Sequence, residues 1–484
     1  MHRVNSPFGQ YNKNTKGIVI IFNFQFTMFY HALEIDEGGC IGCSRCMKIC
    51  PTEAIRIRNG KASIMEDRCI DCGKCHAACP VEAIYIKQDD FKKVHEFPHS
   101  VALLPAVFLG QFPDDIRVSR IYAALKDLGF KHVFEVESAA DIYKEVKHKY
   151  AREHEDDEPL ISSFCPAIVR LIQIKYPSLV SNIIPAKAPL DISAMYVIKL
   201  LTEQRQVPRE EIGIFYVTPC AAKIAAVKAP VGEKRSLIDG VINMDALFNK
   251  VYRKIKEQGK GYEYKALQTP QLSADAILST LTNGERRICL AKRSYAIDGI
   301  ENVMDFLDKL ENDEVEGVEF LELRACDQSC AGALLSSENR FLCGERMYAR
   351  ARKAAERERN GEVARAREME VYKDYLEENA YVEPVQARSM LTLDKDLSKA
   401  YKKLEKINKL KQYLPQVDCG MCGAPTCEAF ATDVVCKQIG LTRCVFYPRH
   451  LERLNDITRQ ECIAAMNSVW GIDPIGDADP PEVM

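Results

Sequence analysis

Apolar runs of strand length alternate with stretches of helical periodicity between residues 98 and 345. The strand-like runs are 101–109, 132–136, 159–163, 212–217 and 318–323, and the helical stretches are 116–130, 139–150, 191–204, 244–258 and 302–310. Strands that alternate with helices of this length are typical of parallel sheets covered by helices. The pattern therefore predicts an α/β domain over 98–345.

Residues 35–90 contain an internal repeat. A cysteine-rich stretch is followed by the strand-like segment AIRIRNGKASI, and a second stretch, which begins 29 positions later (69 minus 40), by AIYIKQDD. Alternation of this kind predicts short strands, and the repeat indicates two copies of one structural unit. We expect a separate small α+β domain over 35–90.

The C-terminal third has three segments that differ in composition and periodicity. Residues 346–392 are rich in Arg, Glu and Ala with little apolar periodicity, which predicts a charged linker of one or two solvent-exposed helices. Residues 393–413 are amphipathic and predict the first helix of a small helical domain over 393–460. The tail is 461–484, and its acidic, Pro-rich part beyond Gly471 is predicted to be disordered.

The N-terminal extension, 1–34, carries the apolar run IVIIFNFQF at 18–26. Nine residues are too few to span a bilayer, and no small-residue cleavage site clearly follows them. We therefore expect residues 1–27 to be a mis-assigned start or a disordered extension before Met28. A native peptide that begins upstream of Met28 would contradict the first of these.

Composition narrows the class of protein. The chain has 484 residues, 47% hydrophobic and 28% charged, with a net charge of −3, which fits a globular protein without nucleic-acid or membrane partners. Its twenty cysteines have no export signal beside them, so metal ligation in a reducing compartment is favoured over disulfides. The expected location is the cytoplasm of an anaerobic cell.

The 35–90 repeat has the cysteine spacing of a two-cluster bacterial ferredoxin. Each copy reads C-x2-C-x2-C-x3-C-P, and the fourth cysteine of each run ligates the other cluster in that pattern. One [4Fe–4S] cluster is assigned to Cys40, Cys43, Cys46 and Cys79, and the other to Cys69, Cys72, Cys75 and Cys50. Zinc or disulfides are the alternatives, but a zinc site needs four ligands, whereas this regular spacing supplies eight.

A second cysteine set lies in the C-terminal domain. Cys419, Cys422, Cys427 and Cys444 follow the spacing C-x2-C-x4-C-x16-C among small residues, which predicts a third [4Fe–4S] cluster with zinc as the alternative. The segment resembles the iron–sulfur domain of electron-transfer complex subunits and of corrinoid-linked carbon monoxide dehydrogenase/acetyl-CoA synthase proteins. Cys436 is interpreted as a packed helix residue.

Four further cysteines follow predicted strands of the α/β domain. They are Cys165 in SSFCP, Cys220 in TPCAAK, and Cys326 and Cys330 in RACDQSC. Functional groups of α/β folds lie at the carboxyl ends of parallel strands, so these thiols could hold a fourth cubane between two lobes. Buried, inert thiols are the alternative.

These three motifs resemble those of iron-only ([FeFe]) hydrogenases, whose catalytic domain follows a ferredoxin domain as here. The resemblance implies a two-lobed α/β fold in which the four thiols hold the cubane of the catalytic cluster. It further implies that Cys330 bridges to a di-iron subsite and that Lys223 faces the ligands of that subsite.

The chain departs from the family at the di-iron pocket. The proton-donor cysteine is replaced by Phe164, and a methionine near the third motif by Arg324. Smaller departures are Thr218, Ala226 and the thinned glycine run Ser329, Gly332 and Ala333. A phenyl ring carries no proton, and bulkier side chains crowd the pocket, so we expect neither a di-iron subsite nor fast hydrogen turnover. The pattern resembles the divergent sensory or non-catalytic branch of the family.

The sequence thus predicts an electron-transfer or redox-sensing protein with four [4Fe–4S] clusters and no assigned catalytic residue. A slow, sensory [FeFe] hydrogenase with a di-iron subsite is the alternative, and a scaffold that hands on clusters or iron is a weaker one. The expected partner is a ferredoxin, an electron-transfer complex subunit or a regulatory protein. Cys289, Cys343, Cys436 and Cys462 receive no role.

Overall fold

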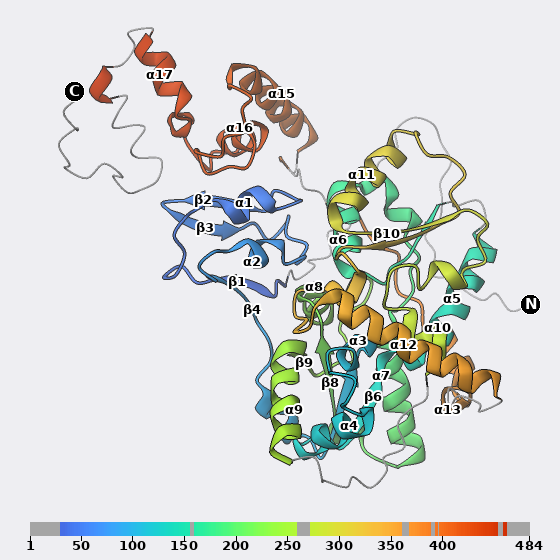
Figure 1. Ribbon diagram of the computed structural model, residues 1–484. Helices are drawn as coiled ribbons and strands as arrows, with labels where there is room; N and C mark the ends of the chain where they lie inside the picture. The colour runs from blue at the N-terminus through green and yellow to red at the C-terminus, as the bar shows by residue number, and fades with distance from the viewer. Residues whose placement is uncertain are drawn as a thin grey trace, which may run out of the picture.

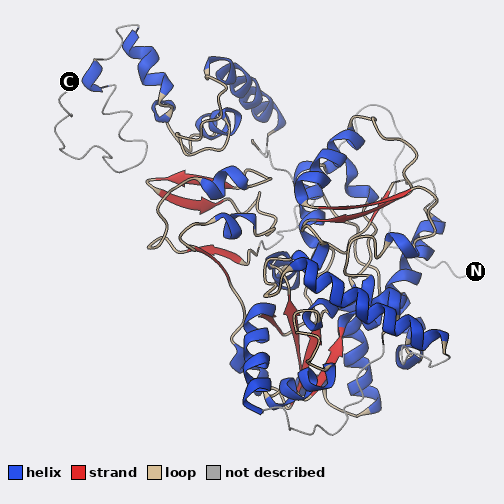
Figure 2. Cartoon of the chain, in the orientation of Figure 1, coloured by secondary structure: helices blue, strands red, loops and turns tan. Residues whose placement is uncertain are grey.

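The computed structural model describes residues 30–154, 159–258, 272–360, 367–388, 393–394, 396–453 and 458–461. The expectations for residues 1–27, for the tail at 462–484 and for Cys462 lie outside these ranges. Within them the fold is mixed α/β, with a small N-terminal domain, a two-lobed body and a helical C-terminal part (Figures 1 and 2).

The N-terminal domain has the short strands that the repeat predicts. Strand β1 (Leu33–Ile35) pairs antiparallel with β4 (Ile84–Ile86), and β2 (Ile55–Arg58) with β3 (Lys61–Ile64). Asn59 and Gly60 both have positive φ, 51° and 71°, which is the backbone of a tight hairpin turn. The helices α1 (Arg45–Ile49) and α2 (Lys74–Ala78) lie inside the two cysteine runs.

The lower lobe of the body is built on a four-stranded parallel sheet in the order β6-β5-β8-β9. Its strands are β5 (His99–Leu104), β6 (His132–Glu135), β8 (Ile212–Thr218) and β9 (Gly240–Asn243). All of β8 is buried, as expected of a strand covered on both faces. The predicted parallel sheet is confirmed here.

The upper lobe has a three-stranded parallel sheet in the order β10-β11-β7. These strands are β7 (Leu160–Ile161), β10 (Ser294–Asp298) and β11 (Phe320–Arg324). Neither β9 nor β10 was predicted from the sequence, because β9 has only four residues and β10 is only partly buried.

Helices cover both sheets. They are α4 (Val118–Asp127), α5 (Ala140–Glu153), α6 (Pro166–Lys175), α7 (Pro189–Lys199), α8 (Ala221–Lys228), α9 (Met244–Gln258), α10 (Ala274–Leu278) and α11 (Ile300–Glu311). The strand predicted for 101–109 is wrong beyond residue 104. Pro105 ends β5, and the short helix α3 (Ala106–Leu109) follows, because a buried apolar run suits either element.

The prediction of solvent-exposed helices after residue 345 is also wrong for α12 (Arg340–Arg359). This helix crosses the body (Figure 1) and buries Met347, Ala351 and Ala354, which repeat at intervals of four and three residues. Small alanines between arginines and glutamates hide this stripe in the sequence. The later helices are α13 (Arg367–Glu370) and α14 (Lys373–Glu378), and Leu376 on α14 is fully buried.

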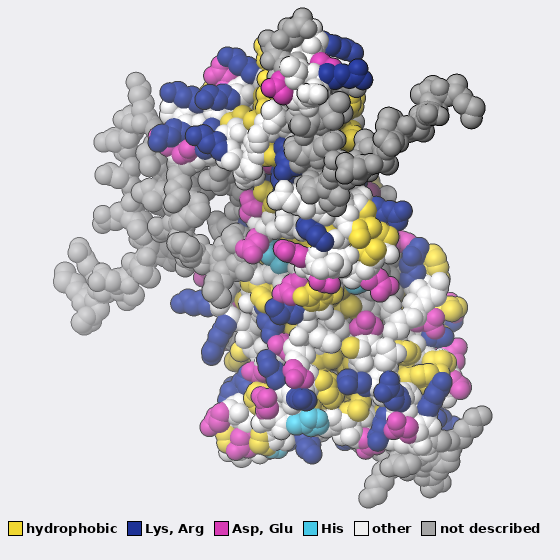
Figure 3. All heavy atoms as spheres, turned by 90° about the vertical axis from the view of Figure 1, so that its left-hand side faces the viewer, with side chains coloured by type: hydrophobic (Ala, Val, Ile, Leu, Met, Phe, Trp, Pro, Cys, Tyr) yellow, Lys and Arg dark blue, Asp and Glu magenta, His cyan; other side chains and the backbone are white. Residues whose placement is uncertain are grey.

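The C-terminal part consists of α15 (Leu397–Tyr413), α16 (Cys427–Val435) and α17 (Phe446–Arg453). Helix α15 exposes several lysines, and Figure 3 shows Lys and Arg side chains gathered in the upper part of the visible face. In the part of the chain that the structure describes, no helix is both long enough and apolar enough to cross a bilayer.

Candidate functional site

The structure brings the eight N-terminal cysteines together in two interleaved sets. Burial, together with the neighbouring Cys43, Cys40 and Cys79, raises the pKa of the Cys46 thiol to about 11. The last cysteine of the second run therefore lies with the first three of the first run. Conversely, Cys50 interacts with Cys72 and Cys75, and it lines one hollow with Cys69, Cys72 and Cys75. This is the crossed arrangement that the spacing predicts for two cubanes.

Backbone amides point at several of these sulfurs. Ala54 N–H donates to Cys50 Sγ at 3.2 Å, Ala83 N–H to Cys79 Sγ at 3.3 Å, and Ala62 N–H to Cys40 Sγ at 3.4 Å. Donors aimed at thiolate sulfur stabilise negative charge and thereby tune a cluster's reduction potential. Burial raises the pKa of the Cys72 thiol to about 12. A bound metal would therefore have to displace that proton.

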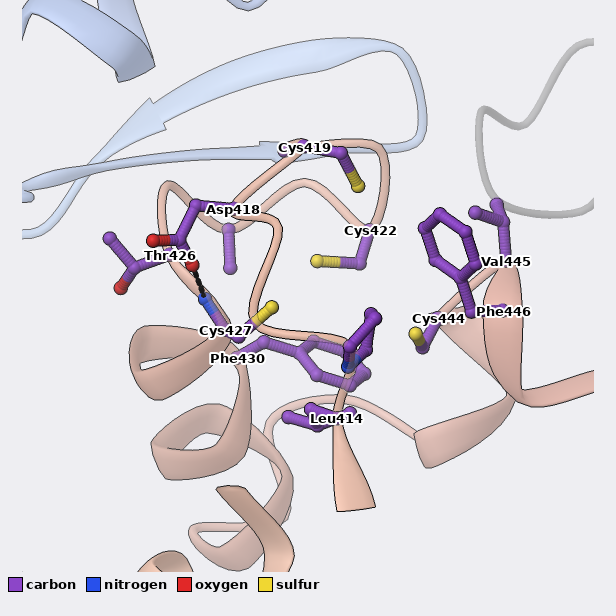
Figure 4. Close-up of a pocket in the computed structure, with 13 residues that line it drawn as sticks. Leu414, Asp418, Cys419, Cys422, Thr426, Cys427, Phe430, Cys444, Val445 and Phe446 are labelled. Atoms are coloured by element: carbon purple, nitrogen blue, oxygen red, sulfur yellow. Dashed lines mark hydrogen bonds between the residues drawn. The ribbon is translucent and has the colours of Figure 1, made fainter. Parts of the chain in front are cut away.

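The C-terminal cysteines line one hollow (Figure 4). Cys419 and Cys422 come from a loop, Cys427 begins α16, and Cys444 directly follows a short 3-10 turn. Asp418 Oδ1 accepts the N–H of Cys427 at 2.6 Å, which fixes the loop against the helix. Leu414, Phe430 and Phe446 form apolar walls, so the site can shield a cluster from water. Cys436 packs instead with the hydrophobic core of this part, as expected.

The four cysteines of the body also converge. Burial, then the neighbouring Cys220, Cys165 and Cys330, raises the pKa of the Cys326 thiol, so these four sulfurs lie close together. Cys165 follows β7 at the N-cap of α6, Cys220 follows β8 at the N-cap of α8, and Cys326 follows β11. Helix N-termini favour negative charge, so this edge of the sheets suits thiolates and the anionic cluster that they would hold.

Two cations and one aromatic ring lie beside these thiols. Lys223 Nζ is 3.9 Å from Cys330 Sγ and 4.7 Å from the centroid of the Phe164 ring. Arg324 Cζ lies 3.7 Å from the same centroid. Burial alone would lower the pKa of Lys223, but the neighbouring Cys330 and other acidic groups hold it above its usual range. The Phe164 ring therefore lies close to two positive charges, the buried Arg324 and the partly buried Lys223.

The arginine anchors a buried ion network that the sequence did not reveal. Glu285 binds Arg324 Nη2 at 2.8 Å, pairs with Lys147 and accepts from Ser162 Oγ at 2.8 Å. Glu322 accepts the backbone N–H groups of Glu285 and Arg286 at 3.0 and 2.8 Å. Burial would raise the pKa of Glu285, but Lys147 and Arg324 lower it on balance. The feature of the sequence that could have revealed this network is Glu322, a charged residue inside the predicted apolar strand 318–323.

One hydrogen-bond donor of this network, on Arg324, is available to bind an anion. Arg324 Nη1 is buried and has no hydrogen-bond partner among the described residues, although the charge of Arg324 interacts with Cys330 and Cys165. Burying a cation with an unused donor is costly unless a negative group stands nearby. A cubane held by four thiolates is such a group, so the residues present fit a [4Fe–4S] cluster at this position.

The second N-terminal set adjoins this site. Besides burial, a thiolate at Cys72 would raise the pKa of Cys326, so the two sulfurs are near each other. Gly73 packs so tightly against Leu334 of the body that a Cβ there would lie 2.3 Å from Leu334 Cδ2. Asp71, between two proposed ligands, is fully buried and accepts from Arg170 on α6 at 2.6 Å. This ion pair joins the small N-terminal domain to the helix that Cys165 caps.

Glu137 gives a testable pH dependence. Burial, then the nearby Glu135, raises its pKa to about 8 from 4.5. Between these pH values the folded chain keeps a proton that the unfolded chain releases, so this group makes stability fall as pH rises from about 4.5 to about 8. Glu137→Gln should flatten that slope in anaerobic urea unfolding. Glu145→Gln, exposed on α5, should leave it as in the parent, and an unchanged slope in Glu137→Gln would refute the assignment.

Comparison with known proteins gives three family matches. Residues 99–254 match "Iron only hydrogenase large subunit, C-terminal domain", residues 32–80 match "4Fe-4S dicluster domain", and residues 414–446 match "Putative Fe-S cluster". The first match ends before Cys326 and Cys330. The chain thus has an iron-only hydrogenase-like region between two iron–sulfur regions.

Individual relatives are distant. Iron hydrogenase 1 of Clostridium pasteurianum is 28% identical over 60% of this chain and 54% of its own length. The periplasmic [Fe] hydrogenase large subunit of Nitratidesulfovibrio vulgaris is 30% identical over 40% of this chain and 50% of its own. The chain thus spans about half the length of these relatives. A solved variant of [FeFe]-hydrogenase HydA1 from Chlamydomonas reinhardtii is 15% identical over 60% of this chain and 95% of its own, with a TM-score of 0.44.

Proposed function

We propose that this iron–sulfur, hydrogenase-like protein transfers or senses single electrons through four [4Fe–4S] clusters and does not turn over hydrogen rapidly. The observation that carries the proposal is the side chain of Phe164, which lies with Arg324 and Lys223 beside Cys330. In this position the chain offers a phenyl ring and two permanent cations. None of these groups can pass a proton at neutral pH.

The four thiol sets support the electron-transfer half of the proposal. A bound [4Fe–4S] cluster supplies one-electron chemistry. Around the sets, backbone N–H donors, Lys223 and Arg324 stabilise negative charge on sulfur, and apolar walls exclude water. These features favour one-electron redox change with little movement of the protein.

The expected partner is a redox protein, such as a ferredoxin or an electron-transfer complex subunit, or a regulatory protein that reads the oxidation state. Both need an exposed cluster site. Cys43 is exposed, and Ile41 beside it is 63% exposed, so the first thiol set is accessible from the surface of the described chain. This supports exchange of electrons with a second protein.

A slow sensory hydrogenase is the second candidate because Lys223 lies 3.9 Å from Cys330, and these are the two residues that would hold and face a di-iron subsite if one were bound. Infrared spectroscopy separates the two functions. After anaerobic maturation, we expect iron and sulfide for four cubanes, and no bands from iron-bound carbonyl or cyanide. Such bands would overturn the first proposal in favour of the second.

Phe164→Cys alone should give no hydrogen evolution. The new thiol would restore a proton donor, but Arg324 would still extend over this position from its ion pair with Glu285. Gas chromatography with reduced methyl viologen should show the same background as the parent. Phe164→Ala serves as the control for loss of the ring, and hydrogen evolution by Phe164→Cys would contradict the blocked pocket.

A further inference from the structure

The C-terminal part is joined to the dicluster domain by a buried ion pair. Asp433 on α16 has only 2% of its side chain exposed, and it accepts from Arg56 Nε at 2.7 Å and from Arg58 Nη2 at 2.5 Å. Both arginines belong to β2, more than 370 residues away in the chain. In Figure 1, the C-terminal helices accordingly lie beside the β2–β3 hairpin.

The backbone continues this contact. Strand β2 pairs with β3 on one side only, and Ile57 N–H on the other side donates to Gly423 O at 2.9 Å. Arg58 Nη1 donates to the same oxygen at 2.7 Å and to Cys422 O at 3.4 Å. The cysteine loop therefore satisfies a free strand edge, which is otherwise an exposed row of donors and acceptors.

Only glycine fits at the centre of this contact. Gly423 has a φ of +80°, and a Cβ there would lie 1.9 Å from Ile57 O. Any side chain would strain the loop and push it from the strand. The loop that carries Cys419 and Cys422 is thus shaped to meet the hairpin.

Charge makes the contact specific. Arg56 is 4% exposed at its side chain, Arg58 is 24% exposed, and Asp433 supplies the carboxylate between them. Without it, two neighbouring guanidinium groups would face each other with little water. Desolvation lowers the pKa of Arg58, and its charge interacts with the Cys422 thiol.

We propose that Asp433 locks the C-terminal domain onto the dicluster domain, and that Arg58 tunes the C-terminal cysteine site. The C-terminal cluster is then a fixed member of the electron relay rather than a mobile carrier. This inference rests on the proposed function only in assuming that the cysteine site holds a cluster. Asp433 is a positioning residue, and Arg58 acts on the site through its charge.

The contacts also give the relay an order. The turn end of the hairpin, which meets the C-terminal loop, approaches the first thiol set, because Ala62 N–H on β3 donates to Cys40 Sγ. The opposite end of the hairpin, at Ile55 and Ile64, lines the hollow of the second thiol set. The second thiol set approaches the body, where Cys72 interacts with Cys326. Electrons would therefore pass between the C-terminal site and the body through both N-terminal sets in turn.

Hydrogen–deuterium exchange of the intact, cluster-loaded chain tests the lock. In Asp433→Asn, and independently in Gly423→Ala, we expect the Ile57 amide to exchange at least about tenfold faster because docking no longer protects it. Iron content should stay at the parent level. Glu428→Gln, on the same helix but paired with Lys411 inside the C-terminal part, should leave Ile57 protected. Unchanged protection in both test variants would overturn the lock.

A redox titration tests the role of Arg58. Arg58→Gln should lower the midpoint potential of the C-terminal cluster, since a positive charge near sulfur favours the reduced state. Arg58→Lys should keep most of the parent value. Equal potentials in all three proteins would overturn the tuning role. A protein without iron at this site would instead refute the proposed function, so the two failures are distinguishable.

Discussion

Cys427→Ser should remove one cluster's iron, about four atoms per chain, and unfold the C-terminal domain while the rest of the chain stays folded. The reason is the size of its hydrophobic core, whose larger members are Leu393, Ile407, Leu414 and Phe430. Below about 70–80 residues such a core supplies no more than about 3–5 kcal/mol, and metal binding commonly provides the remaining stability. Loss of one ligand therefore removes most of the free energy of folding here.

Cys436→Ser is the matched control for this experiment. Cys436 lies at the end of the same helix and packs with the same core, but it does not line the hollow of the four cysteines. Iron analysis and hydrogen exchange across residues 396–453 should find it close to the parent. If both variants lost equal iron, or if Cys427→Ser lost none, the assignment of ligands would be wrong.

Glu285→Ala should lower the free energy of unfolding by about 3–5 kcal/mol, the cost of leaving a buried charge without its partner. Two cations depend on this carboxylate. Lys147 would lose its acidic partner, and Arg324 would keep Glu322 at 3.4 Å and the neutral carbonyl of Ser279 at 3.1 Å. Anaerobic urea unfolding followed by circular dichroism measures the change.

An exposed ion pair provides the comparison. Asp305 pairs with Lys309 on α11, and 70% of the Asp305 side chain is accessible to water. Asp305→Ala should therefore leave the unfolding midpoint almost unchanged, because water replaces the lost partner. An equal effect of the two substitutions would show that the Glu285 network is not the buried support inferred for Arg324.

The two wrong predictions and the missed network have a common cause. Periodicity could not show that α12 is buried, because its stripe consists mainly of alanines between charged residues. It also could not separate β5 from α3 within one apolar run. Glu285, in a segment without a recognisable pattern, becomes important only where Lys147 and Arg324 meet it.

The sequence by itself determined the cysteine sets, the parallel sheets and the resemblance to hydrogenases. Ligand spacing within a loop and burial along a strand are local properties, and neighbours in the chain set them. Only the tertiary structure decided that Arg324 and Lys223 both lie against the Phe164 ring, and that Asp433 meets Arg56. Ion pairs between distant segments leave no local pattern in the sequence. A charged residue that is exposed to water can have the same neighbours in the chain as one that is buried against a partner.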